Sequence, residues 1–254
     1  MTAASGPHLR LPRLLFGSAA LLLHLFFPPV FPGASAFAAS QPDPPKIGVL
    51  APLSGPYAAG GTSFVQAAAL AVERANAEGG VSGRRVEIVV GDTQGRVDVA
   101  KTEALRLVSR EKVAALVGAY LSEETVGVME VAAAERKVLL VPVAATSEIT
   151  DKVRREYGRY RYVFRVGYSL PQWAEMIAAF LSDRKVSRYA FVGAGIRWNV
   201  ELGETLARAA APKGITPAYT AYYSPGNPAF DTVAVAAAAA SPDIVIVADP
   251  GRNS

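Results

Sequence analysis

Apolar positions in residues 113–150 form a short run, then recur at helical spacing, and then form a second short run. Residues 113–118 and 138–143 are rich in Val and Leu, which is typical of strands buried on both faces of a parallel sheet. The apolar residues between them line much of one face of a predicted amphipathic helix: Val126, Met129, Val131, Ala132 and Ala134. The segment therefore predicts a strand, a helix and a second, neighbouring strand.

Both predicted strands end in short turns that carry hydroxyl groups. The first turn is Tyr120-Leu121-Ser122 and the second is Ala144-Ala145-Thr146. In an open parallel sheet, ligands bind outside the carboxyl ends of the strands, so these turns are the candidate ligand site. Free N–H groups at a helix start also suit a carboxylate.

The same alternation continues through the chain. Strands are predicted at residues 46–52, 85–90, 162–166, 189–192, 216–222 and 243–247, and helices at 62–77, 97–110, 170–181, 201–210 and 231–239. Residues 151–161 are a charged connection, and Gly79-Gly80 ends the first helix because glycine tolerates a left-handed C-cap. This order predicts a doubly wound α/β architecture with parallel sheets.

The pattern restarts after Gly167, which predicts two lobes, residues 46–167 and 168–254, with a crossing at 165–170. The second lobe would hold only about 85 residues and would end on a strand, with one sheet edge open. We therefore expect a partial second lobe in a truncated chain.

The first 39 residues have the composition of a secretory signal peptide. Arg10 and Arg13 precede an apolar run over residues 14–31, and small residues at 34–38 offer a cleavage site. A membrane anchor is the competing interpretation, but prolines at 28, 29 and 32 interrupt the run before it reaches the ~20 residues that a span needs. Without cysteine the chain has no lipidation site, so we expect a periplasmic protein that is not a lipoprotein.

Composition excludes several kinds of chemistry. The chain has no cysteine, and its two histidines, His8 and His24, both lie in the predicted signal peptide. A mature chain without either residue cannot hold a Ser-His-Asp triad, a cysteine nucleophile or an imidazole or thiolate zinc site. Removal of Arg10 and Arg13 leaves 24 basic against 22 acidic residues, with no basic stripe to indicate nucleic acid. We expect no enzyme activity, no cofactor and no metal.

Several spaced motifs resemble one known family. They are KIGVLAPLSGPYAAGG from residue 46, ANAEGGVSGRRVEIVVGD from residue 75, the SEETV and VAATSEIT turns, and VFRVG from residue 163. Together they resemble periplasmic solute-binding proteins of type I fold, in the branched-chain amino acid (Leu/Ile/Val) group that serves ABC importers. The resemblance covers about residues 46–247 and implies two α/β lobes that close on a small ligand.

The resemblance also implies which residues bind the ligand. The matching positions are Ser122 in the first turn, Ala144, Ala145 and Thr146 in the second turn, Trp198 as an aromatic from the second lobe, and Tyr57 in the first ligand loop. Tyr120, beside Ser122, completes the candidate set. The chain departs from the family's pattern in two ways: glycine replaces a tyrosine near Gly60, and the acidic partner of the ligand's ammonium group falls beyond Ser254.

Structural roles compete with each of these assignments. Ser122 could be only an N-cap, Thr146 could only begin a turn, and Trp198 is equally consistent with packing. The phenols of Tyr57 and Tyr120 could simply cover the lobe surface. Ser122 and Thr146 at adjacent strand ends favour ligand contact.

The favoured function is capture of an amino acid or a similar small carboxylate or amide for an ABC transporter permease. The alternative is a periplasmic sensing module of the same fold that feeds a signalling receptor. A hydrolase on an α/β scaffold is a third possibility, which the lack of histidine and cysteine disfavours.

Overall fold

The computed structural model describes residues 43–224 and 230–249, so the predicted signal peptide lies outside the described residues. Strands and helices alternate along this part of the chain. The strands are β1 (Lys46–Ala51), β2 (Glu87–Asp92), β3 (Ala115–Val117), β4 (Val138–Val141), β5 (Val163–Arg165), β6 (Arg188–Ala194), β7 (Thr216–Tyr223) and β8 (Ile244–Ala248). The helices are α1 (Ala58–Ala77), α2 (Val97–Ser109), α3 (Ser122–Ala134), α4 (Ser147–Arg155), α5 (Tyr157–Tyr160), α6 (Leu170–Asp183), α7 (Arg197–Ala210), the 3-10 helix η1 (Ala211–Lys213) and α8 (Phe230–Ala239).

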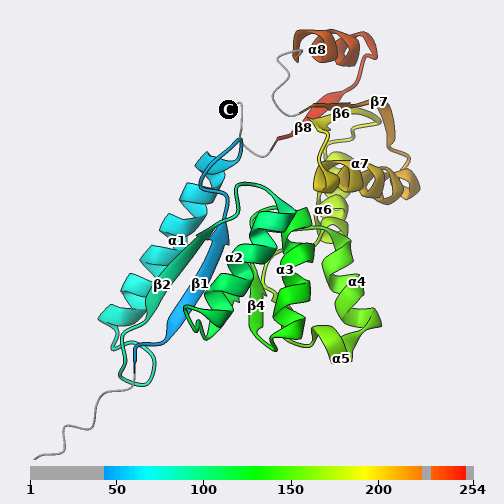
Figure 1. Ribbon diagram of the computed structural model, residues 1–254. Helices are drawn as coiled ribbons and strands as arrows, with labels where there is room; N and C mark the ends of the chain where they lie inside the picture. Colours follow the sequence, from blue (N-terminus) through cyan, green and yellow to red (C-terminus); the bar gives the residue numbers. More distant parts are fainter. Residues whose placement is uncertain (1–42, 225–229, 250–254) are drawn as a thin grey trace, which may run out of the picture. The chain divides into compact units, whose positions relative to one another are not determined.

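The first sheet contains five parallel strands in the order β2-β1-β3-β4-β5. Figure 1 shows α1 on one side of β1 and β2, with α2 and α3 on the other side. We call this sheet together with α1–α5 the first lobe. All five strands run in one direction, so the turns that follow β3 and β4 meet at the same edge of the sheet.

The core of the first lobe lies under α2 and α3. Leu50, Leu116 and Leu139 point from successive strands toward Leu107 and Met129, and all five are fully buried. Side chains alternate between the two faces of a strand, so the neighbours of these residues point to the opposite face, where α1 lies over β1 and β2. The opposite face is less well covered near β5, where the side chain of Phe164 is 50% exposed.

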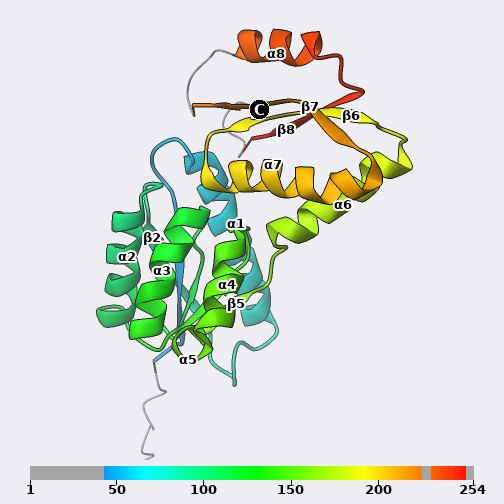
Figure 2. The same ribbon diagram turned by 90° about the vertical axis from the view of Figure 1, so that its right-hand side faces the viewer.

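The second sheet has three parallel strands in the order β7-β6-β8. Figure 2 shows α6 and α7 on one face of this sheet and α8 on the other. We call this sheet with α6–α8 the second lobe. Its core contains Leu181, Phe191 and Leu206, which are almost completely buried.

The structure confirms the doubly wound parallel architecture and the order of the elements that the sequence predicts. Gly79 and Gly80 have φ of 102° and 73°, as the predicted end of α1 requires. Two expectations for the loops are wrong. Residues 151–161 are not a simple connection, because α4 and α5 occupy 147–160, and α7 begins at Arg197 rather than at residue 201. The predicted lobe boundaries at residues 167 and 168 stay a prediction.

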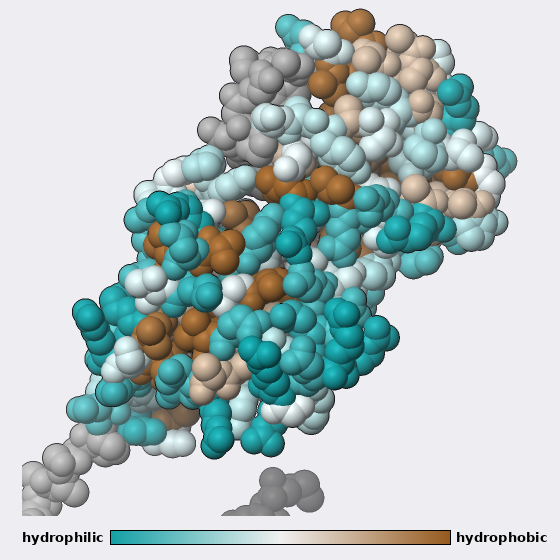
Figure 3. All heavy atoms as spheres, turned by 45° about the vertical axis from the view of Figure 1, so that its right-hand side comes forward, coloured by the Kyte–Doolittle hydropathy of each residue, from teal (hydrophilic) through white to brown (hydrophobic). Residues whose placement is uncertain are grey.

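Exposed apolar side chains are spread over both lobes. The most exposed in the described chain include Leu70, Val166, Tyr168, Val235 and Val247. On the side drawn in Figure 3, brown apolar patches are separated by teal hydrophilic surface. Among the described residues no helix combines the length and apolar character needed to cross a bilayer.

Candidate functional site

The two predicted ligand turns lie next to each other in the first lobe. Tyr120, Leu121 and Ser122 connect β3 to α3, and residues 142–146 connect β4 to α4. The backbone N–H of Thr146 donates to Oγ of Ser122 at 3.4 Å, and both side chains are buried. One long hydrogen bond therefore joins the hydroxyl-bearing ends of both turns.

Ser122 is not the N-cap that the sequence predicts. Leu121 is the N-cap of α3, with an extended backbone, and Ser122 is the first helical residue. The carboxylate of Glu124 accepts from the N–H of Leu121 at 3.1 Å, which satisfies a donor at the helix start. Burial raises the pKa of Glu124. The hydroxyl of Ser122 accepts from the N–H of Thr146 in the second turn.

Arg165, at the end of β5, holds the carbonyl groups of the second turn. Its guanidinium donates to the carbonyl oxygens of Ala144 at 3.1 Å and Thr146 at 2.5 Å, and to that of Tyr168 at 3.3 Å. Burial lowers the pKa of Arg165, although the charge of Glu201 opposes this effect. Arg165 thus stabilises the second turn by binding the carbonyl groups of that turn. The N–H groups of Thr146 and Ser147 bind other residues.

Helix α7 of the second lobe provides one of those partners. Thr146 Oγ1 donates to Glu201 Oε2 at 2.5 Å, and the N–H of Ser147 donates to Glu201 Oε1 at 2.8 Å. At the start of the same helix the N–H of Arg197 donates to Glu123 Oε1 at 3.1 Å, and its guanidinium pairs with Glu148. Helix α7 therefore binds the second turn through Glu201 and the first residues of α3 and α4 through Arg197.

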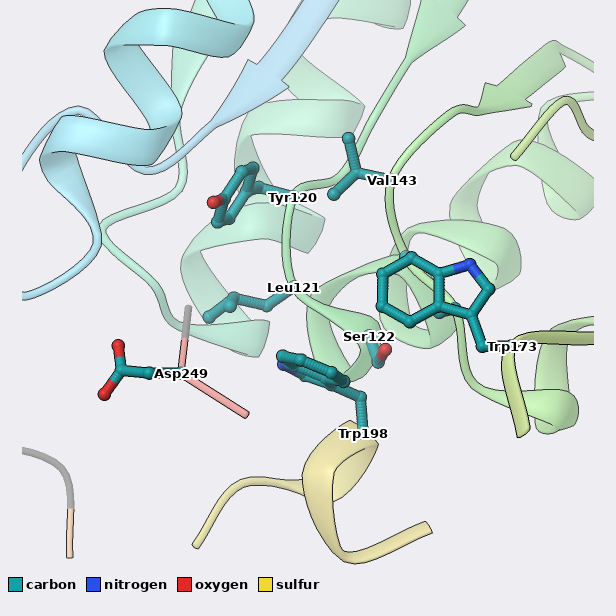
Figure 4. A pocket seen from close by; sticks show the side chains of 9 residues that line it. Tyr120, Leu121, Ser122, Val143, Trp173, Trp198 and Asp249 are labelled. Atoms are coloured by element: carbon teal, nitrogen blue, oxygen red, sulfur yellow. The ribbon is translucent and has the colours of Figure 1, made fainter. Parts of the chain in front are cut away.

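A cavity of about 250 Å³ lies where these elements meet. Figure 4 shows Trp173 of α6 and Trp198 of α7 on either side of Ser122, with Tyr120 and Val143 along the first-lobe wall. The complete lining is Tyr120, Leu121, Ser122, Val143, Ala144, Ala145, Trp173, Trp198 and Asp249. The walls are mainly apolar and aromatic, with a few polar groups, as is usual for sites of small molecules.

The structure brings five of the seven predicted site residues together in this cavity. They are Tyr120, Ser122, Ala144, Ala145 and Trp198. The other two do not line it. Thr146 is buried behind the turn, where its hydroxyl also accepts from the N–H of Glu148 as the N-cap of α4. Tyr57 lies beside Gly95, whose added Cβ would be 3.1 Å from the Tyr57 ring.

Tyr120 occupies the space created by a glycine of α1. A Cβ added to Gly60 would lie 2.3 Å from the phenol oxygen of Tyr120. The Tyr120 ring also meets Phe64 edge-to-face, with ring centres 6.5 Å apart, and burial raises its pKa. The glycine near position 60, where the resemblance implies a tyrosine, therefore accommodates a tyrosine from another turn.

Sequence reasoning did not identify four residues that shape the site: Arg165, Trp173, Glu201 and Asp249. Trp173 was the most predictable of the four, because helical spacing puts it on the same face of α6 as the buried Leu170 and Ala174. Asp249 follows β8, the third strand of the second sheet, and the hydroxyl of Tyr223 donates to its carboxylate. Hydrogen bonding to Asp249 raises the pKa of Tyr223 further, beyond the effect of burial.

The polar groups at the cavity suit recognition of a solute. Among the described residues no three His, Cys, Asp or Glu side chains gather as metal ligands would. The cavity is lined by the hydroxyl-bearing side chains of Tyr120 and Ser122 and by two indole rings, while the carboxylate of Asp249 points away from the other lining side chains (Figure 4) and accepts from the Tyr223 hydroxyl. Aromatic faces bind flat or apolar bodies, and the few polar groups orient them.

Two curated binding proteins are similar to this chain in sequence. The chain is 32% identical over 139 residues to Leu/Ile/Val-binding protein homolog 7 of Brucella abortus, which covers 55% of this chain and 33% of that protein. It is 33% identical over 142 residues to the chemotactic signal transduction system substrate-binding protein BasB of Halobacterium salinarum, covering 55% of this chain and 34% of BasB.

Solved structures share the fold. A leucine-binding protein of Thermotoga maritima superimposes with a TM-score of 0.68 at 21% identity, covering 80% of this chain and 55% of that one. A solute-binding protein of an ABC transporter from Rhodopseudomonas palustris, solved with p-hydroxybenzoic acid, gives a TM-score of 0.71 at 20% identity and covers 82% and 54%. The matched region is thus about one third of these curated relatives and about half of these solved chains. A family model described as periplasmic binding protein matches residues 44–254, and the chain belongs to this family, with the type I fold.

Proposed function

We propose that this chain is an extracytoplasmic binding protein that captures a small solute in the cavity between Trp198 and the two first-lobe turns. The main support is that five residues predicted from the sequence, from both lobes, line one cavity. A volume of about 250 Å³ is below the 300–1,000 Å³ typical of drug-sized ligands. The solute is therefore small, of the size of an amino acid or a simple aromatic acid or amide.

Transport is the favoured role. The solute-binding relative from Rhodopseudomonas palustris belongs to an ABC transporter, and other relatives are described as Leu/Ile/Val-binding. We infer delivery of an amino acid or a related carboxylate or amide to an ABC transporter permease. Co-purification of the loaded protein with a permease encoded beside it would support this role, and equal retention of unloaded protein would count against it.

Sensing is the second candidate. The observation that favours it is the likeness to BasB, which is described as part of a chemotactic signal transduction system. The two roles use the same cavity and differ in the membrane partner. Permease and ATPase genes beside this gene would favour transport, and a receptor or kinase gene would favour sensing.

Lobe closure is the proposed mechanism. Ligand contacts from both lobes would shift the population toward a closed state, because a ligand favours the state to which it binds more tightly. Crossing residues 165–170 would absorb the movement. Small-angle scattering at saturating ligand should show a more compact particle, and an unchanged radius of gyration would contradict closure.

We propose no catalytic step, cofactor or nucleic-acid partner. The residues around Ser122 include no histidine or cysteine that could act as its base, because the chain has no cysteine and both histidines precede residue 25. Turnover of an ester or amide that disappeared in Ser122→Ala would contradict this proposal.

We also propose that the protein acts in the periplasm after cleavage of residues 1–39. The basic residues, apolar run and small residues of this segment support export. Mass spectrometry of the periplasmic fraction should find a chain that begins near residue 40 without a lipid. A chain that kept residues 1–39 in the membrane fraction would indicate an anchor instead.

A further inference from the structure

We propose that the first lobe carries a second binding site, at the end of its sheet opposite the solute cavity, and that this site takes a phosphate-bearing anion. A cavity of about 420 Å³ lies there, within the range of roughly 300–1,000 Å³ that is typical of small-molecule sites. The proposed capture of a solute does not use this cavity. Its lining is Asp43, Pro44, Pro45, Lys46, Arg84, Arg110, Glu111, Lys112 and Ala114.

The second cavity lies at the amino ends of the first-lobe strands. Lys46 is the first residue of β1, Ala114 directly precedes β3, and Arg84 lies in the loop before β2. In Figure 1, β1 begins at the lower end of the first lobe. The parallel strands put their carboxyl ends, with the two ligand turns, at the other edge of the sheet. No residue lines both cavities, so each site can be altered by substitutions that leave the other site intact.

The lining of this second cavity has a surplus of positive charge. Four of its side chains are cations: Lys46, Arg84, Arg110 and Lys112. In the part of the chain that the structure describes, none of the four forms an ion pair. Of the two lining acids, Glu111 already accepts from Arg106 at 3.1 Å, and Asp43 is exposed. Two guanidinium and two ammonium groups therefore have donors to offer to an anion.

Backbone hydrogen bonds hold together the segments that carry these cations. The N–H of Ala114 donates to the carbonyl of Lys46 at 2.8 Å, which joins the loop before β3 to the start of β1. The N–H of Glu87 donates to the carbonyl of Pro45 at 3.0 Å and joins β2 to the same segment. Residues 81–84 form a turn that two backbone hydrogen bonds close. The cations thus extend from an ordered backbone, which lowers the cost of binding a ligand.

The chemistry of the lining favours a phosphate group over a single carboxylate. A phosphate monoester carries about −1.5 to −2 charges at pH 7 and three strong acceptor oxygens, whereas a carboxylate carries one charge and two oxygens. Guanidinium groups such as those of Arg84 and Arg110 bind phosphate oxygens in pairs, and lysine adds a compact charge. The group is supplied either by a soluble molecule or by a lipid headgroup, since the phosphate chemistry of the two is the same.

Calorimetry with methyl phosphate tests the site in the full chain, with sodium acetate at equal ionic strength as the single-charge comparison. The variants are Arg84→Gln, Arg110→Gln and the control Arg136→Gln. Arg136 is an exposed cation in the loop between α3 and β4, at the same end of the sheet, and does not line the cavity. The cavity cations have no ion-pair partner, so all variants should melt as the wild type does.

The wild type and Arg136→Gln should bind methyl phosphate with the same affinity, and acetate at least about tenfold more weakly. Loss of a charged donor in Arg84→Gln or Arg110→Gln should weaken methyl phosphate binding by about tenfold. Equal affinities in all four proteins would mean that only the overall charge attracts the anion, and would overturn the proposal. Acetate bound as tightly as methyl phosphate would overturn it as well.

Vesicles distinguish the two sources of the phosphate group. Flotation is measured with phosphatidylcholine vesicles that contain or lack phosphatidic acid. Binding of methyl phosphate without flotation assigns the site to a soluble ligand. Flotation that requires phosphatidic acid, and that Arg84→Gln abolishes while Arg136→Gln retains it, assigns the site to a headgroup. A wild type that neither binds methyl phosphate nor floats with phosphatidic acid would overturn the second site, whatever the outcome for solute capture in the first cavity.

Discussion

The indole rings of Trp173 and Trp198 meet edge-to-face, with centres 6.0 Å apart and planes inclined by 86°. They come from the start of α6 and the start of α7, two helices that pack together in the second lobe. These are the two tryptophans of the whole chain, and both line the cavity. The aromatic wall is thus part of the second lobe's own packing.

Trp198→Ala should weaken solute binding by about 10- to 100-fold. Truncation removes a large aromatic surface from the cavity wall, and central aromatic residues often contribute 2 kcal/mol or more to binding. Calorimetry of the variant with the best ligand of the wild type measures the effect. Met176→Ala, an exposed substitution on α6, is the control and should bind as the wild type does. Equal affinity in Trp198→Ala would show that the indole only packs.

Gly60→Ala should weaken binding with little loss of stability. The new methyl would overlap the phenol of Tyr120, which has to turn away from α1 and change the shape of the cavity. Alanine itself favours a helix over glycine by up to ~1 kcal/mol, which offsets part of the strain. Gly158→Ala in α5 meets no atom within 4 Å and is the matched control. Thermal melts and ligand titrations of both variants separate packing from binding, and unchanged affinity in Gly60→Ala would contradict the role of Tyr120.

Arg165→Lys should destabilise the protein by about 1–3 kcal/mol. A lysine keeps the charge but cannot bind the carbonyls of Ala144, Thr146 and Tyr168 with the planar fork of a guanidinium. Denaturant unfolding measures the change. Arg161→Lys, at an exposed position just before β5, should stay within ~0.5 kcal/mol of the wild type. Equal stabilities of the two variants would mean that Arg165 does not hold the turn.

Glu130 should make the stability of the first lobe depend on pH. Burial alone would raise its pKa, but hydrogen bonds from Tyr160 at 2.7 Å and Lys152 at 3.0 Å, with the charge of Arg159, lower it. Because the folded pKa is the lower one, the stabilisation is complete above the unfolded pKa, near 4.5, and is lost as pH falls through the folded value.

Glu130→Gln should therefore lower the free energy of unfolding by about 1–2 kcal/mol at pH 7 and match the wild type at strongly acidic pH. Urea unfolding between pH 3 and 7 tests this expectation. Glu135→Gln, at the exposed C-cap of the same helix, is the control. A constant difference between Glu130→Gln and the wild type at every pH would contradict the ionic origin of the effect.

Periodicity of apolar residues was sufficient to predict the sheets and most helices. Val and Leu runs identify β3 and β4, and helical spacing identifies α3, because burial in a parallel sheet dictates both patterns. The sequence analysis missed helices α4 and α5, because residues 147–160 are mostly polar. Only a few side chains of these helices, such as Ile149 and Tyr160, are buried. The spacing of apolar residues predicts a helix poorly when few of its positions are buried.

Two kinds of evidence predicted the cavity residues: the ends of parallel strands, and for Trp198 of α7 the resemblance to a known family. Ser122, Ala144 and Ala145 come directly from the rule that ligands meet the carboxyl ends of parallel strands. Glu201 and Asp249 could not be found this way, because their positions depend on how a helix and a strand of the second lobe approach turns more than 50 residues earlier in the chain. The N-cap expectation for Ser122 was wrong because Glu124, three residues after Leu121, supplies the capping interaction.

The most direct test of the central claim is a tryptophan fluorescence titration of the full chain with amino acids, their amides and small aromatic acids. Because Trp173 and Trp198 both line the cavity, the intrinsic emission reports on that cavity. The account predicts a saturable change in emission with one ligand class, and a melting temperature that rises by about 2–4 °C at 100 times the dissociation constant. A folded protein whose emission and melting temperature no solute changes would contradict the proposal that this cavity captures such a solute.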